Sequence, residues 1–425
     1  MLGPFRIIPT VQNYSWGKRG NESALAPLLE SVSPDLPYAE LWVGSHSSGT
    51  ARLDSTIGLS LRSDQSNLPS PFPSNLRALI ESEPLLCLGE KIVRTYGELP
   101  FLLKVLSVAE PLSIQAHPDR ILGEELHQKD PTHYPDRNHK PEVGIALTPV
   151  HLLCGFKGRE EIGATLQRHP TLRSLLPEEV VSRCEGKIAS IAEDELRYAV
   201  YRSLLTAPSI ERSRVADKIL RTIIDHGPIG IFEPLIPTLI NTYGGDDIGI
   251  ISGLLLNEVI IEPGKALFIG PNIPHAYLWG DLIECMAASD NVVRAGLTCK
   301  YQDVDTLLSM LDYRAGRPTI IEPHRFDDDE SKTALYPAPV EEFFVSVTSA
   351  SNQPSSHQTD GSPEILLILA GRAEIKTADV ENIHLDRGNG LFVPASVSHY
   401  EISPHECTYV RVSIPDTTSP QRCTD

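Results

Sequence analysis

Residues 261–277, with the sequence IEPGKALFIGPNIPHAY, have a second copy near the C-terminus, at residues 385–401, with the sequence LDRGNGLFVPASVSHYE. Each copy has a strand, a glycine turn, a second short strand, a proline and then a histidine. Short strands with this punctuation are typical of antiparallel jelly-roll barrels. The repeat therefore predicts two related barrels, with His275 and His399 at equivalent strand positions.

A helical unit is inserted between the β segments of the first barrel, before its last strands, from about residue 158 to residue 245. Within it, one helical face carries Val215, Ile219, Leu220, Ile223 and Ile224, and residues 193–205 are also helix-like. Strand character is expected to return at residues 248–256. The predicted fold class is mainly β with an α-helical insertion, comprising two jelly-roll barrels and a helical domain.

Composition and charge limit the partners of the protein. The 425 residues carry a formal net charge of −19, from 56 acidic and 37 basic residues, which disfavours nucleic acid and anionic membranes as partners. The seven cysteines are scattered without a C-x-x-C pattern, which is typical of a reducing compartment. With no signal-peptide pattern at the start and no apolar run of membrane-spanning length, we expect a cytoplasmic protein.

A possible metal site begins with Gln115 and His117. Residues 99–108 are predicted to form a buried strand, and residues 112–117 a second one. Side chains two residues apart on a strand share a face, so Gln115 and His117 would point together into the interior. An amide oxygen and an imidazole nitrogen are suitable ligands for a divalent metal, but a structural polar pair explains these two residues as well.

Two later segments favour the metal site. His139, Lys140 and Glu142 place three ionisable groups within four residues, although this segment alone is equally consistent with a solvated loop. His275 completes a set of two imidazoles, one carboxylate and one amide oxygen. Such a set suits Zn²⁺ with an open coordination position, or another first-row divalent metal.

The stretch from residue 280 to residue 300 holds spaced charges among small and apolar residues. A solvated charge run would have more charges and fewer apolar neighbours, so these side chains are predicted to point inward. Arginine and lysine here suit phosphate binding. The charged residues are Asp281, Glu284, Asp290, Arg294 and Lys300.

Six blocks of the sequence together resemble type I phosphomannose isomerase (mannose-6-phosphate isomerase), a family of the cupin superfamily. They occur in the order of that family and extend over most of the chain. The blocks are QNYSWG (12–17), AELWVG (39–44), LSIQAHPD (112–119), NHKPE (138–142), PHAY (274–277) and ECMAASDNVVRAGLT (284–298).

The resemblance implies two cupin-like barrels and a helical domain. Residues 1–157 would form the N-terminal part of the catalytic barrel, residues 158–245 the helical domain and residues 246–325 the remainder of the catalytic barrel. Residues 326–425 would form a C-terminal cupin-like barrel. We expect this second barrel to be structural, because nothing beside His399 matches Gln115, His117 or Glu142.

The resemblance also implies the site residues. One zinc ion per chain would be bound by Gln115, His117, Glu142 and His275, and Arg294 would be the active-site arginine. Further pocket residues would be Ser113, Lys140, Tyr277, Glu284, Asp290 and Lys300. Three residues depart from the family pattern, namely Cys299 beside Lys300, Trp279 after the PHAY block, and Ile273.

The implied reaction is the reversible isomerisation of mannose 6-phosphate and fructose 6-phosphate through a metal-stabilised cis-enediol(ate), which supplies mannose 6-phosphate for GDP-mannose and glycosylation. The metal would act as a Lewis acid, and Arg294 would stabilise charge or assist ring opening. Candidates for the proton-transfer base are, in order, His139 relaying with Lys140, then Asp290, then Glu284.

Several residues are expected to contact the substrate, and two rival functions remain open. Ser113, Lys300 and Lys140 are the candidates for the phosphate, and Tyr277 is a further substrate contact. The only partner expected is the small sugar phosphate, with the chain acting as a monomer. The rivals are a catalytically silent sugar-phosphate-binding paralogue and an iron-dependent cupin oxygenase, since two histidines and one carboxylate also form an iron triad.

Overall fold

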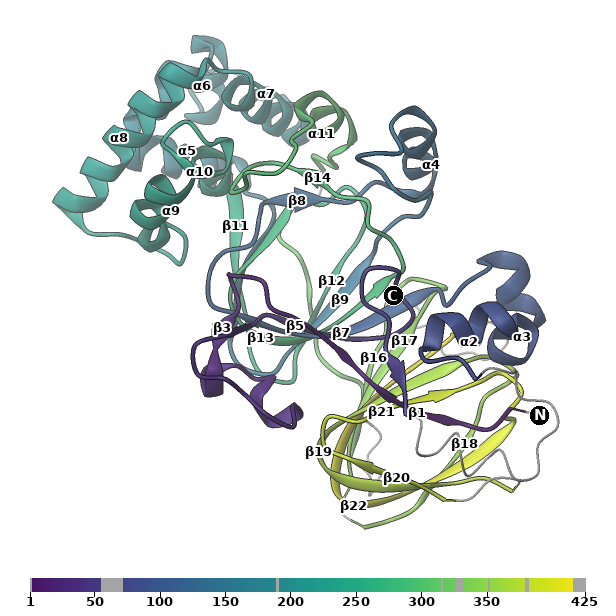
Figure 1. Ribbon diagram of the computed structural model, residues 1–425. Helices are drawn as coiled ribbons and strands as arrows, with labels where there is room; N and C mark the ends of the chain where they lie inside the picture. The colour runs from purple at the N-terminus through teal and green to yellow at the C-terminus, as the bar shows by residue number, and fades with distance from the viewer. Residues whose placement is uncertain are drawn as a thin grey trace.

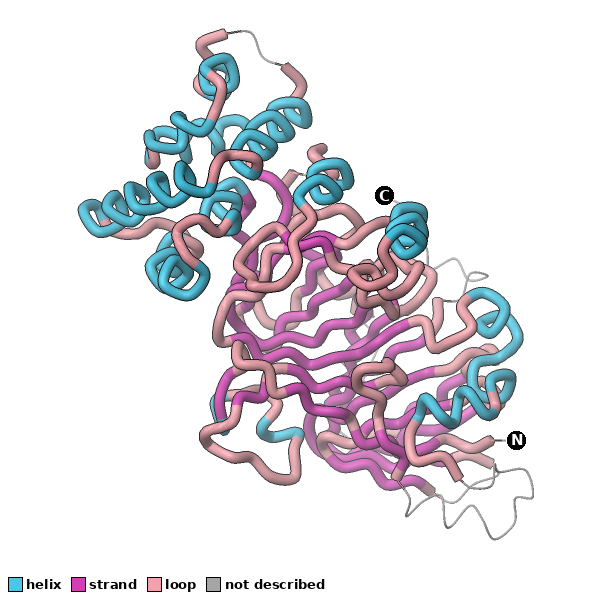
Figure 2. The backbone as a smooth tube through the Cα atoms, turned by 45° about the horizontal axis from the view of Figure 1, so that its top comes forward, coloured by secondary structure: helices cyan, strands magenta, loops and turns pink. Residues whose placement is uncertain are grey.

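Two large antiparallel sheets and a group of helices make up the protein. The computed structural model describes residues 2–54, 72–188, 191–314, 316–325, 332–350, 352–378 and 382–415. Most of the helices gather at one end of the molecule, the C-terminal sheet lies at the other, and the sheet with the candidate site lies between them (Figure 1; Figure 2). The predicted fold class, mainly β with a helical insertion, is confirmed. Closure of each sheet into a jelly-roll barrel stays a prediction.

Within the described residues, the central sheet has eleven strands. Its longest strand, β13, pairs with β7, β8, β9 and β10, so it holds the sheet together. The strands are β2 (Thr10–Gln12), β5 (Glu40–Val43), β7 (Phe101–Val108), β8 (Gln115–Ala116), β9 (Glu142–Ala146), β10 (Val150–Phe156), β11 (Leu256–Ile261), β12 (Ala266–Ile269), β13 (His275–Ala287), β14 (Val293–Arg294) and β15 (Ile320–Ile321).

Of the two strands predicted around residues 99–117, the first forms over most of its length and the second is much shorter. All eight residues of β7 are buried, as a mainly apolar run predicts for a strand covered on both faces. The second strand is reduced to Gln115–Ala116. Leu112 and Ile114 donate their backbone N–H groups to Tyr277 and Gly296, so the residues before β8 are still tied to the sheet.

The C-terminal sheet has nine strands within the described residues, and two of them come from the N-terminus. β1 pairs with β21 on one side and with β6 on the other. The sequence pattern did not predict that two strands from the N-terminus join the C-terminal sheet. The strands are β1 (Phe5–Ile8), β6 (Arg52–Leu53), β16 (Thr333–Tyr336), β17 (Phe344–Ala350), β18 (Ser355–Gln358), β19 (Glu364–Lys376), β20 (Ile383–Asp386), β21 (Gly390–Val393) and β22 (His399–Ser413). A separate pair is β3 (Lys18–Arg19) and β4 (Pro37–Tyr38).

The internal repeat is visible in the strand order. β12 and β21 are four-residue strands in equivalent places, and each is followed by a short loop and a long strand. His275 is the first residue of β13, and His399 is the first residue of β22. The two copies therefore have the same local structure, as the repeated sequence predicts.

The helical insertion begins directly after β10. Its elements are α5 (Arg159–Arg168), η4 (Pro170–Leu175), α6 (Glu178–Cys184), α7 (Glu193–Leu205), α8 (Ser209–His226), η5 (Glu233–Leu235), α9 (Ile236–Tyr243), α10 (Ile248–Ser252) and η6 (Gly253–Leu255). Elsewhere lie η1 (Gly20–Glu22), η2 (Ala26–Leu28), α2 (Leu76–Ser82), α3 (Pro84–Thr95), α4 (Arg120–Lys129) and α11 (Val304–Met310). None of the described helices combines the length and the apolar character that crossing a bilayer requires.

The strand expected to begin at residue 248 is wrong for its first eight residues, which form α10 and η6. Asp247 caps the helix, because its side chain accepts the backbone N–H of Gly249. All of these residues are buried, and an apolar run buried on every side has no periodicity that separates a helix from a strand. β11 begins only at Leu256.

Arg197 of α7 anchors the helical insertion to the central sheet. Its buried guanidinium donates to the carbonyl oxygens of Lys157, at the end of β10, and of Tyr313, at 3.0 and 2.9 Å. The rings of Phe156, Tyr201 and Tyr313 pack beside it, with centroid separations of 5.1 to 6.5 Å. The helices are therefore fixed against the same strands that lead to the site.

Replacing Ile7 by alanine tests the role of β1 in the C-terminal sheet. Ile7 is fully buried and pairs with Gly390, so Ile7→Ala should lower the free energy of unfolding by about 2–5 kcal/mol, as expected for a buried isoleucine. Urea unfolding followed by circular dichroism measures it. Ile224→Ala is the matched control. The sequence pattern placed Ile224 on the apolar face of α8, but its side chain lies at the edge of that face and is 71% exposed, so its loss should cost less than about 0.5 kcal/mol. Equal effects of the two variants would contradict the packing of β1.

Candidate active site

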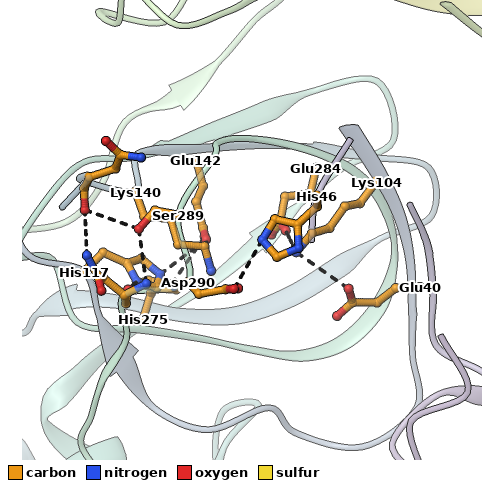
Figure 3. Close-up of polar contacts among 12 residues, drawn as sticks. Glu40, His46, Lys104, His117, Lys140, Glu142, His275, Glu284, Ser289 and Asp290 are labelled. Atoms are coloured by element: carbon orange, nitrogen blue, oxygen red, sulfur yellow. Dashed lines mark hydrogen bonds and ion pairs between the residues drawn. The ribbon is translucent and has the colours of Figure 1, made fainter. Parts of the chain in front are cut away.

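Three buried side chains from separate parts of the chain meet at one point of the central sheet. His117 follows β8, Glu142 begins β9 and His275 begins β13. Their ligand atoms lie within 4.8 Å of one another. The Nε2 atoms of His117 and His275 are 3.3 and 3.5 Å from the two carboxylate oxygens of Glu142 (Figure 3).

Backbone carbonyls orient both imidazoles. Nδ1 of His117 lies 2.8 Å from the carbonyl oxygen of Asn291, and Nδ1 of His275 lies 2.9 Å from that of Ile273. A carbonyl can only accept, so each Nδ1 carries the proton and donates it. Each Nε2 is then left with a lone pair directed at the cluster.

The two Nε2 atoms fit a metal ion. Both are buried, and neither has a hydrogen-bond partner among the described residues. A buried nitrogen lone pair without a partner is unfavourable unless a cation fills the position. Burial, with the charge of Lys140 adding to it, lowers the pKa of His117 to about 4, so the imidazole is neutral, as a metal ligand must be. The donor set of two imidazoles and a carboxylate suits a divalent metal.

Gln115 lies beside this cluster. In the strand register it is opposite His275 on one side and opposite Arg294 on the other. Its place in β8 is consistent with the predicted fourth ligand, but no contact of its amide shows that role. Gln115 as a metal ligand therefore stays a prediction.

Lys140 is the predicted basic residue closest to the cluster. It is buried, and its Nζ is 3.4 Å from an oxygen of Glu142. Burial alone would raise the pKa of Glu142, but the neighbouring groups, among them His117 and Lys140, lower it well below the usual value. Glu142 is therefore a carboxylate at neutral pH.

Tyr277 supplies a buried hydroxyl group with no hydrogen-bond partner among the described residues. Burial and the charges of Glu284 and Glu142 raise the pKa of the phenol well above its usual value, so the hydroxyl keeps its proton and can donate it. The neighbouring strand makes room for it with a glycine, since a Cβ at Gly144 would lie 2.6 Å from the hydroxyl oxygen.

A second row of charged side chains runs from Glu284 away from the metal ligands (Figure 3). Lys104 lies between two carboxylates, with Nζ 3.2 Å from Glu284 and 3.6 Å from Glu40. All three are buried, and the indole N–H of Trp42 donates to Glu40. Burial and the charge of Glu142 raise the pKa of Glu284 to about 7, although Lys104 opposes the change.

Asp290 is placed between Lys140 and His46 in Figure 3. Its carboxylate is 3.3 Å from Nε2 of His46, and this contact lowers the pKa of Asp290 below its usual value. The turn that carries it is fixed by Asp136, which accepts the backbone N–H of Asp290 at 2.7 Å and the hydroxyl of Ser289 at 2.8 Å. The two acids, Glu284 and Asp290, thus have pKa values moved in opposite directions.

His139 is not brought to the cluster by any contact. Its Nε2 lies 2.7 Å from a carboxylate oxygen of Glu342 and 3.1 Å from the guanidinium of Arg120. Lys140, the next residue, contacts Glu142, which agrees with the opposite directions of successive side chains in extended chain. The predicted role of His139 as a base stays a prediction without a supporting contact.

The candidates for phosphate binding lie on segments around the cluster. Ser113 is half-buried in the segment that leads to β8, and Lys300 is exposed, with its backbone N–H bonded to the hydroxyl of Thr298. Arg294 is half-buried, and its guanidinium has no hydrogen bond or ion pair with another described residue. Arg294 is therefore available for an anionic ligand.

The residues that depart from the family pattern leave the metal ligands intact. Cys299 is exposed beside Lys300, and Ile273 accepts the Nδ1–H of His275 through its backbone alone. Trp279 is 43% exposed, with the ammonium of Lys18 4.5 Å from its ring centroid and His151 packed beside it. These contacts of Trp279 include none of the site residues.

Sequence reasoning missed several residues of the site. Lys104 is a single lysine within the buried apolar strand β7, and this was the signal that could have found it. Glu40, Trp42 and His46 come from residues 39–46, whose role is visible only when β5 pairs with β7. Asp136 and Glu342 carried no signal, because isolated acids in polar segments are usually exposed.

The chain is similar in sequence to known proteins over most of its length. Residues 4–159 match the family model of the catalytic domain of type I phosphomannose isomerase. Mannose-6-phosphate isomerase 2 of Arabidopsis thaliana is 38% identical over an alignment of 404 residues, and the match covers 91% of this chain and 88% of that protein. This chain belongs to the mannose-6-phosphate isomerase family. The human mannose-6-phosphate isomerase is 37% identical over 92% of this chain and 94% of its own length.

A solved structure of the family has the same fold over the whole chain. A mannose 6-phosphate isomerase bound with zinc and yttrium superposes with a TM-score of 0.78, at 30% sequence identity, and covers 98% of this chain and 100% of its own. The family assignment confirms the resemblance inferred from the six sequence blocks. The cluster of His117, Glu142 and His275 in turn indicates a metal site.

The two repeat histidines provide a matched test of the metal site. His275→Ala removes one of the buried ligand atoms, so the purified variant should retain less than about a tenth of the bound divalent metal after dialysis. His399→Ala should retain the wild-type amount, because His399 is exposed and bonds only to the hydroxyl of Ser356 at 2.8 Å. Metal analysis of both proteins measures the difference, and equal metal content would contradict the site.

Proposed function

We propose that this protein catalyses the reversible isomerisation of mannose 6-phosphate and fructose 6-phosphate. Membership of the mannose-6-phosphate isomerase family supports the reaction. The observation that carries the site assignment is the pair of unpartnered Nε2 atoms, of His117 and His275, on either side of the Glu142 carboxylate.

The cofactor in this proposal is one zinc ion per chain, held by His117, Glu142, His275 and Gln115. Two imidazoles with oxygen ligands suit zinc, and a related structure contains zinc. When bound, the ion supplies Lewis-acid stabilisation of the negative charge that develops on the sugar oxygens when the proton next to the carbonyl is removed.

The chain's own residues have distinct tasks in this reaction. Arg294, with no partner among the described residues, stabilises developing negative charge or assists opening of the sugar ring. Tyr277 donates a hydrogen bond from its buried hydroxyl. Lys140 holds Glu142 ionised and supplies a positive charge beside the sugar.

Proton transfer between C1 and C2 of the sugar is assigned to Glu284 and Asp290. Their environments move the two pKa values apart, to about 7 for Glu284 and below the usual value for Asp290. Such a divergence is typical of paired acid and base groups. Glu284 is placed first, because a carboxylate with a pKa near the working pH is the better proton carrier. This order replaces the sequence-based preference for His139, whose imidazole bonds to Glu342.

The phosphate group of the substrate is assigned to Lys300 and Ser113, with Lys140 as a third contact. Cationic groups on a phosphate add charge-assisted hydrogen bonds. In this proposal the protein acts in the cytoplasm as a monomer and supplies mannose 6-phosphate for GDP-mannose and glycosylation.

The direct test measures conversion of mannose 6-phosphate to fructose 6-phosphate before and after metal removal. The purified protein should be active, lose activity on dialysis against a strong chelator and regain it when about one equivalent of Zn²⁺ per chain is added. A protein that is inactive with zinc present would favour the silent paralogue. Oxygen consumption with bound iron would favour the oxygenase.

Arg294→Ala should separate catalysis from metal binding. The guanidinium does not contact the metal ligands through any described hydrogen bond, so the variant should keep its metal. It should lose about 10²–10³-fold in kcat, the usual cost of removing one stabilising group from a developing charge. Arg294→Lys is the control that keeps the charge and should recover part of the activity. Full activity of Arg294→Ala would refute the assigned role.

The pH dependence of kcat/KM tests Glu284 as the base. Burial raises its pKa to about 7, so lowering the pH through this value protonates the carboxylate and abolishes its ability to accept a proton. The value of kcat/KM should therefore fall as the pH is lowered below about 7. A bound cation favours the ionised form of Glu284, so it moves this fall to a lower pH.

Two variants identify the group that titrates. Glu284→Gln should remove the acid limb and lower kcat by about 10²–10⁴-fold, while Asp290→Asn should keep the limb at the same pH. Stopped assays from pH 5 to pH 9 measure both profiles. An acid limb that persists in Glu284→Gln would assign the base to another group.

A further inference from the structure

Glu342 comes from the C-terminal sheet unit, in the segment that links β16 to β17. Its side chain is only 4% exposed, although its neighbour Glu341 faces solvent. One carboxylate oxygen of Glu342 lies 2.7 Å from Nε2 of His139 and also accepts a hydrogen bond from Arg120. The other oxygen accepts the backbone N–H of Glu341 at 3.1 Å.

The two partners of Glu342 lie next to two metal ligands. Arg120 is three residues after His117 and is the first residue of α4, and His139 is three residues before Glu142 and β9. One carboxylate of the C-terminal unit thus joins the two segments that carry His117 and Glu142. We name this arrangement of Glu342, Arg120 and His139 the Glu342 clamp.

Close packing beneath the clamp brings the same two segments together. A Cβ at Gly123 of α4 would lie 2.9 Å from the carbonyl oxygen of Asn138, so only a glycine allows this approach. The same carbonyl accepts the side-chain amide of Asn291 at 2.9 Å, and the backbone carbonyl of Asn291 accepts from His117. A shift of either segment is therefore passed on to the imidazole of His117.

We propose that Glu342 is a positioning residue for the metal site, through which the C-terminal unit sets the separation of His117 and Glu142. A buried carboxylate is stable only while charged or hydrogen-bonding partners face it, so the contacts of Glu342 hold Arg120 and His139 in place. Partners outside the ligand shell fix the orientation of ligands, and their loss typically weakens metal binding 10- to 100-fold. The C-terminal unit then helps to hold the metal ligands in position.

The inference rests on the proposed metal site, and zinc affinity is its readout. In full-length protein, competition with a chromophoric chelator gives the zinc Kd, and the isomerase assay gives kcat and KM. Glu342→Ala should weaken zinc about 10-fold and lower kcat at saturating zinc, with KM changed less than about threefold. Glu341→Ala is the matched control and should match the wild type in all three quantities.

A conservative variant separates positioning from general stability. Glu342→Gln keeps an oxygen that can accept from Arg120 and His139, so zinc affinity should recover to within about threefold of the wild type. A purely structural role would lower the melting temperature of Glu342→Ala without changing the zinc Kd of the folded protein. That result would overturn the proposal.

Three further outcomes are decisive. If Glu342→Ala does not fold, Arg120→Ala breaks the clamp at a side chain that is 55% exposed, and an unchanged zinc Kd in that variant overturns the proposal. A wild-type protein that binds no zinc overturns the proposed metal site and the clamp together. Wild-type binding with an unaffected Glu342→Ala overturns the clamp alone.

Discussion

Burial of the Glu142 carboxylate among two imidazoles and the Lys140 ammonium is the interaction on which the site depends. A carboxylate in this position is unstable without cationic or metal partners, so the strands that carry the partners must meet around it. The sheet provides this meeting point because β13 pairs with both β8 and β9. The carbonyl of Asn291 and that of Ile273 then leave the imidazole lone pairs directed at one point.

The charged groups around this point form two sets with different tasks. Lys140 keeps Glu142 ionised, whereas Lys104 lies between Glu284 and Glu40 in the second row of charged side chains, which runs away from the metal ligands. Two buried lysines thus face three buried carboxylates, so part of the negative charge is left for other partners. Burial raises the pKa of Glu284 to about 7, which suits the proton transfer proposed for it.

Much of the site could be predicted from the sequence, since its ligands occur in short motifs with their own strand and turn signals. The spacing of Gln115 and His117, the NHKPE segment and the repeat that ends at His275 each carried a local pattern. The supporting residues had no such pattern. Lys104 looks like an interruption of an apolar strand, and Glu342 becomes a partner of His139 only through packing between units. The helix at Ile248–Ser252 was missed because full burial removes the periodicity that identifies a helix.

The place of β1 in the C-terminal sheet has a consequence for how the chain is made. Phe5 and Ile7 are synthesised long before Phe392 and Gly390, their partners in β21. Until β21 is made, β1 can pair only with β6 on its other side, while the central sheet and the helical insertion form. Contacts this distant in sequence slow folding and leave an apolar strand open to wrong partners during synthesis.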